Sequence, residues 1–159
     1  MNRKIHRRAW LLLSAGLWLG AAQAGDDPAI RLDFRDFLAA PMGREGIRWS
    51  PALLAADGRS VQLVGYMVKQ ESPPAGGFML TPRPVQMSED SDGAADDLPP
   101  TWVMVHLDPS QAHHLVPYTS GPIQLTGVLS VGRAEEADGR VSWLRLQLAP
   151  EAVRELKRS

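Results

Sequence analysis

Alternation of apolar and polar residues dominates the chain after Gly58 and predicts strands. Successive side chains on a strand point to opposite faces, so a period of two marks an element with one buried side. Five segments are alternating or rich in β-branched and aromatic residues, and each is bounded by Gly, Pro or Asp. They are Ser60–Lys69, Gly77–Thr81, Trp102–Leu107, Pro122–Val131 and Arg140–Leu148. Asp138-Gly139 predicts a hairpin turn between the last two.

Helical spacing and capping signals predict short helices around these strands. In Leu32–Leu38, the residues Phe34, Phe37 and Leu38 share one side of a helix and would cover a core. Ser50 followed by Pro51 is typical of an N-cap and first helical position. Two further helices are predicted, over Asp108–Leu115 and Pro150–Lys157.

A short pattern shared by two strands indicates how the sheet is shaped. Val61–Gly65 and Ile123–Gly127 both read apolar, Gln, Leu, any residue, Gly, and a glycine inside a strand commonly marks a bulge or a sharp bend. Bent strands and a helix between the third and fourth predict an all-β fold, a five-stranded OB-like barrel with short flanking helices. The alternative is an open antiparallel sheet with helices, of the α+β class.

The N-terminal residues read as an export signal. Arg3, Lys4, Arg7 and Arg8 precede an apolar run at 9–20, and Ala22-Gln23-Ala24 is a small-x-small cleavage signal. The run is shorter than the roughly 20 residues of a membrane-spanning helix. We therefore expect a cleaved signal peptide at 1–24, a periplasmic protein with no membrane span after cleavage, a lead-in at 25–48, the OB-like domain at 49–149 and a C-terminal helix at 150–159.

Charge and cysteine content narrow the class of partner. Cleavage would remove four of 17 basic residues and none of the 18 acidic ones, which leaves a net charge of −5. Nucleic-acid binding requires the opposite balance, so no nucleic-acid partner is expected. Because the chain has no cysteine, neither a disulfide nor a lipoprotein anchor is available, and stability must come from a hydrophobic core.

Large side chains fall on the side of two strands that faces away from the predicted core. Val103, Val105 and Leu107 form the inner set of one strand, and Leu144, Leu146 and Leu148 that of another. The outer sides and a neighbouring methionine form a candidate partner-binding face: Met79, Trp102, Met104, His106, Trp143 and Arg145. The alternative is that the lead-in or the C-terminal helix covers this face.

Metal and catalytic signals are weak. Adjacent His113 and His114 would point about 100° apart on a helix, and no spaced histidine pair accompanies them or His106. Met79 and Met104 with His106 offer soft ligands to copper, but methionine also fills cores. The acidic segment Ser88–Asp97 resembles the start of a calcium loop without its closing glutamate. No metal or cofactor is assigned, and without a nucleophile elbow, a phosphate loop or a cysteine the chain is predicted to be non-enzymatic.

The middle of the chain resembles a family of bacterial periplasmic proteins built on a domain of unknown function. The matching segments are Trp49-x-x-x-Leu-Leu, Asp57–Val68, Phe78–Leu80, Pro99-Pro100 and Leu125–Leu129. The family's cysteine and histidine segment before the third strand is missing here, so no metal or thiol role carries over. The resemblance implies an exported, OB-like accessory domain that works beside envelope transport or metal-handling machinery. Together with the candidate partner-binding face, it leads us to expect a non-enzymatic adaptor to envelope transport machinery, with a protein partner in the cell envelope. The alternative is a periplasmic metal-binding or metal-homeostasis protein.

Overall fold

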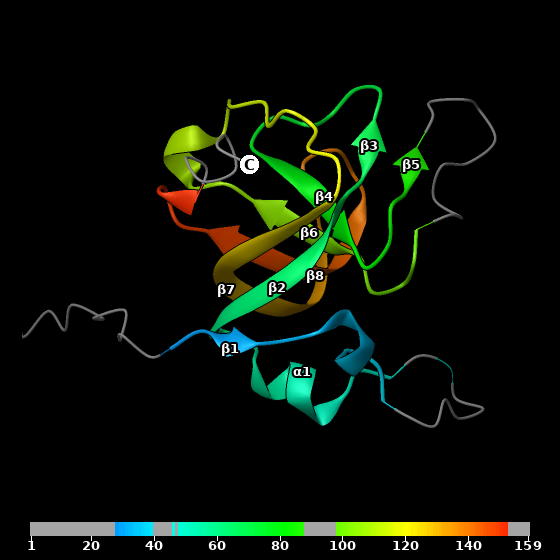
Figure 1. Ribbon diagram of the computed structural model, residues 1–159. Coiled ribbons are helices and arrows are strands. Elements are labelled where there is room, and N and C mark those ends of the chain that lie inside the picture. The colour runs from blue at the N-terminus through cyan, green and yellow to red at the C-terminus, as the bar shows by residue number, and fades with distance from the viewer. Residues whose placement is uncertain (1–27, 40–45, 47, 88–97, 153–159) are drawn as a thin grey trace, which may run out of the picture.

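Strands form at all five predicted positions in the computed structural model, which describes residues 28–39, 46, 48–87 and 98–152 (Figure 1). The long elements are β2 (Ser60–Met67), β4 (Gly77–Thr81), β6 (Val103–His106), β7 (Pro122–Glu135) and β8 (Val141–Leu148). Three strands of two residues were not predicted: β1 (Ile30–Arg31), β3 (Lys69–Gln70) and β5 (Gln86–Met87). The fold is all-β with little helix, as the alternation predicted.

The long strands pair in a closed ring. β2 pairs with β4, β4 with β6, and β7 with β8, all antiparallel, whereas β6 and β8 are parallel. Antiparallel pairing of β2 with β7, from Ser60↔Val128 to Tyr66↔Pro122, completes the circuit. An open antiparallel sheet, the alternative fold, accounts for neither the β2–β7 pairing nor the parallel pair.

The two glycine-containing segments are direct partners across this closure. Val61 lies opposite Gly127, and Gly65 lies opposite Ile123. A Cβ atom added at Gly127 would lie 2.5 Å from the carbonyl oxygen of Gln147, and one at Gly65 would lie 2.9 Å from that of Thr81. Glycine is therefore required where neighbouring backbone comes too close for any side chain.

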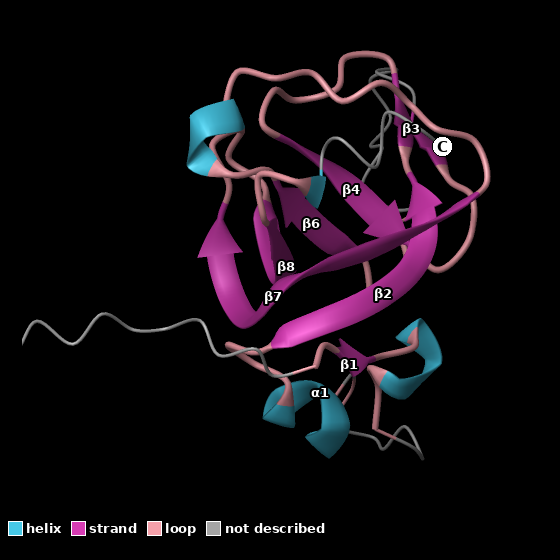
Figure 2. Cartoon of the chain, turned by 60° about the vertical axis from the view of Figure 1, so that its left-hand side comes forward, coloured by secondary structure: helices cyan, strands magenta, loops and turns pink. Residues whose placement is uncertain are grey.

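The ring encloses one main core, which contains the inner side chains predicted from alternation. Val103, Val105, Leu144 and Leu146 are completely buried. Phe34 and Phe37 also belong to this core, with ring centroids 4.9 Å apart. Figures 1 and 2 show the segment that carries them, together with β1 and the helix α1 (Pro51–Ala55), at one end of the ring.

Three of the helix predictions were too long or lie outside the described residues. The predicted Leu32–Leu38 helix is a single 3₁₀ turn, η1 (Phe34–Asp36), capped by Asp33, whose pKa is lowered by a side-chain hydrogen bond from Arg35. The Asp108–Leu115 helix is likewise reduced to η2 (Pro109–Gln111). Cap signals are local, but a helix continues only where tertiary contacts bury one of its faces. Most of the predicted C-terminal helix lies outside the described residues.

Gly127→Ala tests the close backbone contact between β7 and β8 at the position where β7 also pairs with β2. We expect the free energy of unfolding to fall by about 1–3 kcal/mol, because the added methyl group must displace backbone of β8. The neighbouring Thr126 is exposed, so Thr126→Ala should cost less than about 1 kcal/mol and provides the matched control. Equal urea midpoints for the two variants would show that the close approach of β7 and β8 does not require glycine at this position.

Candidate functional site

The outer face of β4 and β6 is a second, smaller core. Met79 and Met104, both predicted to lie on a partner-binding face, are 1% and 8% exposed. They cluster with Val68 and Met87, and Trp102 packs against this group. The cover includes Met87 of β5, which neither the lead-in nor the C-terminal helix supplies. The two methionines are therefore not available to a partner.

The tip of the β7–β8 hairpin lies over this second core and is held there by polar contacts. The Nη1 atom of Arg140 lies 3.5 Å from the Sδ atom of Met79. The carboxylate of Glu136 accepts a hydrogen bond from the hydroxyl of buried Ser142, and its other oxygen lies 3.1 Å from Nε2 of His106. Predicted partner-face residue His106 thus joins a contact between β6 and the hairpin.

Arg145, also predicted on the partner face, supports an irregularity in the same hairpin. The β7–β8 register shifts between Val131 and Ala134, where Gly132 has a φ of 137°. The guanidinium of Arg145 donates to the carbonyl oxygen of Gly132 at 2.8 Å and lies 3.3 Å from the hydroxyl oxygen of Ser142. A bulge increases local twist, so these contacts stabilise the bend of the hairpin.

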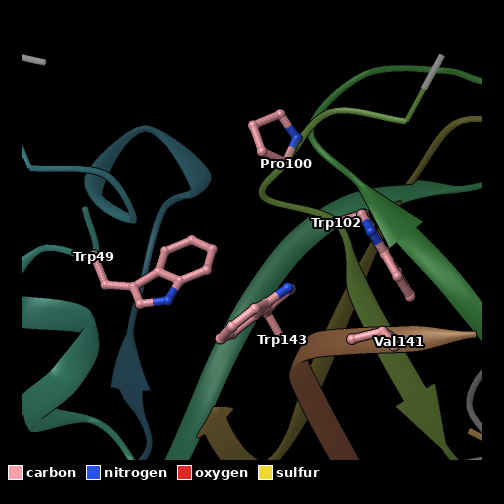
Figure 3. Close-up of a pocket in the computed structure, with 5 residues that line it drawn as sticks. All are labelled: Trp49, Pro100, Trp102, Val141 and Trp143. Carbon is pink, nitrogen blue, oxygen red and sulfur yellow. The ribbon is translucent and has the colours of Figure 1, made fainter. Parts of the chain in front are cut away.

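Beside the second core an open pocket of about 410 Å³ is lined by aromatic and aliphatic side chains. Its lining residues are Trp49, Pro100, Trp102, Val141 and Trp143. In Figure 3, Trp49 lies on one side of the pocket and Trp102 on the other, with Trp143 between them and Pro100 opposite Trp143. The only other tryptophans of the chain, Trp10 and Trp18, lie in the predicted signal peptide. Every tryptophan beyond residue 24 therefore lines this one pocket.

Local structure explains how distant segments supply these walls. Trp49 precedes the α1 cap residue Ser50, whose hydroxyl accepts from the Leu53 amide, and it forms a bridge with Leu38. Pro100 occupies the second position of a turn closed by the Trp102 amide donating to the Pro99 carbonyl, a position that favours proline.

The remaining walls come from one edge of the ring. Val141 and Trp143 are alternate, outward residues of β8, and Trp143 is 48% exposed. The parallel register Met104↔Arg145, continued back by two residues, places Trp102 beside Trp143.

The three indoles are separate from one another and have unused polar atoms. Among the described residues, the only ring pair in contact is Phe34–Phe37, whose planes are tilted, so the pocket tryptophans do not pack ring against ring. No hydrogen bond between described residues engages the indole N–H of Trp49, Trp102 or Trp143. Because Trp, Pro and Val side chains contain no acceptor, the lining side chains provide apolar surface and N–H donors alone.

Two of the six residues predicted to form a partner-binding face line the pocket. Trp102 and Trp143 are brought together, whereas Met79 and Met104 are buried and His106 and Arg145 hold the hairpin. Trp49, Pro100 and Val141 were missed as site residues, although Trp49 and Pro100 belong to the segments on which the family resemblance depends.

Metal ligands do not gather in the part of the chain that the structure describes. No group of three or more His, Asp or Glu side chains there is placed to hold an ion. His113 is exposed, while Nε2 of His114 is buried without a hydrogen-bond partner. The acidic segment Ser88–Asp97 lies outside the described residues. Within them, no helix has the length and apolarity to cross a membrane.

Comparison with known proteins finds one similar solved structure, a DUF3299 family protein from Pseudomonas aeruginosa. It is 16% identical, with a TM-score of 0.43, and the match covers 75% of this chain and 91% of the other. At this level the likeness supports neither shared site residues nor a shared function. No protein-family model matches the chain, and no curated protein matches its sequence.

Glu136→Ala tests the polar attachment of the hairpin. Its removal leaves the completely buried Ser142 hydroxyl without its acceptor and His106 without its carboxylate, so we expect a loss of about 1–3 kcal/mol in the free energy of unfolding. Glu135→Ala is the matched control, because Glu135 is exposed and should change stability by less than about 0.5 kcal/mol. Chemical denaturation measures the free energy of unfolding of both variants. Equal losses would show that the contacts of Glu136 do not contribute to stability.

Proposed function

We propose that this protein is an exported, non-enzymatic binding module of the bacterial periplasm, an adaptor that holds a protein partner of the envelope transport machinery. The single observation that carries the proposal is the tryptophan pocket, open to solvent on the outside of the strand ring. Aromatic residues are enriched where proteins bind partners, and tryptophan is among the side chains whose removal costs most affinity.

The ring of strands supports an OB-like barrel as the frame of this module. Five strands close on one another, and the parallel β6–β8 pair requires the crossover that a Greek-key connection provides. OB folds commonly bind ligands on the face of their second and third strands, here β4 and β6. In this chain the second core covers that face. We therefore place the binding surface at the border of the second core, where Trp102 and Trp143 lie.

The chemistry of the pocket favours binding over catalysis. None of its five lining side chains is a nucleophile, an acid or a base. Export rests on the predicted signal peptide at 1–24, which lies outside the described residues.

Trp143→Ala tests the proposal better than a substitution of Trp102. Trp102 packs against the second core, whereas Trp143 is 48% exposed and its removal should leave the fold intact. We expect cross-linking in intact envelopes to recover a specific complex with the unmodified protein and to lose it, by at least tenfold, with Trp143→Ala.

Tyr118→Ala is the matched control, since Tyr118 is an equally exposed aromatic residue that does not line the pocket. It should retain the complex. Loss of the complex in both variants, or in neither, would refute the pocket as the binding surface.

A further inference from the structure

We propose that the tryptophan pocket binds a proline-rich segment of the partner protein in the extended polyproline II conformation. This inference rests on the proposed function and specifies the chemistry of its ligand. A ligand complementary to the pocket has apolar rings that pack on the indoles and acceptors for the indole N–H groups. It has no donor that would need an acceptor from the lining side chains.

Hydrogen-bond complementarity selects proline among peptide ligands. A proline residue has a backbone carbonyl but no N–H, so a run of prolines presents acceptors alone. In polyproline II these carbonyls have no internal partner and point outward. The lining side chains of the pocket have the opposite composition, because the indoles of Trp49, Trp102 and Trp143 donate and no side chain accepts. The carbonyl groups of a proline run can therefore accept the hydrogen bonds that the indole N–H groups donate.

The arrangement of the rings fits the same ligand. The indoles are separated, and Figure 3 shows them on different sides of an open space rather than stacked on one another. Proline-rich segments bind grooves lined by aromatic side chains, and their preformed conformation lowers the entropy lost on binding. The lining carries no formal charge, which matches an uncharged proline run.

Two other ligand classes fit less well. Sugar hydroxyls donate as well as accept, and none of the lining side chains accepts, so a sugar matches the donor-only side chains of the pocket less fully than a proline run does. A quaternary ammonium binds the faces of aromatic rings but leaves the indole N–H groups without acceptors. Both serve as competing ligands in the test.

The decisive experiment follows the indole N–H signals of the purified, ¹⁵N-labelled protein by NMR during titration with acetylated, amidated hexaproline. We expect saturable shifts of the Trp49, Trp102 and Trp143 signals with a Kd below about 1 mM. Trp→Phe variants assign each signal. A soluble Gly-Ser hexapeptide, which has backbone donors, should produce no saturable change.

Variants of Trp143 distinguish the contribution of the aromatic ring to binding from that of the indole N–H. Trp143→Phe keeps an aromatic ring and removes the N–H, so it should weaken hexaproline binding about threefold to tenfold. Trp143→Ala should weaken it at least tenfold, and Tyr118→Ala should leave it unchanged.

The proline assignment is overturned if hexaproline causes no saturable shift, or if cellohexaose or choline shifts the indole signals at lower concentration. Should hexaproline fail while Trp143→Ala still abolishes the envelope complex, the pocket remains a binding surface and its ligand is of another class. If hexaproline does not bind and Trp143→Ala does not abolish the envelope complex, both the proposed function and the proposed ligand are refuted.

Discussion

The antiparallel pairing of β2 with β7 is the constraint on which the rest of the structure depends. It converts a row of strands into a ring, so neither β2 nor β7 is left as an exposed edge. At its two ends, Gly65 brings β2 close to the backbone of β4 and Gly127 brings β7 close to the backbone of β8, so the neighbouring pairings of the ring also depend on glycine. Without closure the main core would be open on one side, and neither hairpin nor pocket would have a fixed frame.

The length of β7 connects this closure to the pocket. Its first half pairs with β2, and the strand then continues past the bulge near Gly132 to pair with the start of β8. That continuation extends the hairpin over the outer face of β4 and β6, where Arg140 and Glu136 make their contacts. The start of β8 also holds Val141 and Trp143, so one hairpin both covers the second core and provides one wall of the pocket.

Prediction from the sequence succeeded where the signal is local and failed where it depends on distant contacts. Alternation located the five long strands and their inner side chains, because burial on one face imposes a period of two. It placed Met104 outside the main core but could not show that this side would be covered. That cover includes two-residue strands, which are too short to have a period, and a hairpin whose bend depends on Arg145.

The pocket residues illustrate the same limit. Trp102 and Trp143 were identified because they are large apolar residues on the outward side of alternating strands. Trp49 lies outside any named strand and reaches the pocket through its bridge with Leu38 and its packing against the main core. Figure 1 shows β1 and α1 together at one end of the ring, an arrangement that no local pattern encodes.

The walls of the pocket are anchored in two different cores, and this anchoring bears on how the pocket binds. Trp49 packs against the main core, Trp102 packs against the second, and Trp143 extends from β8, which borders both. Side chains held in this way lose little further freedom when a ligand enters, which lowers the entropic cost of binding. Trp143 is half exposed, and none of the three indole N–H groups is among the buried polar atoms without a partner, so in the free protein these donors face solvent. A preorganised frame combined with aromatic surface and solvent-facing donors is the arrangement expected of a surface whose contacts are completed by a ligand.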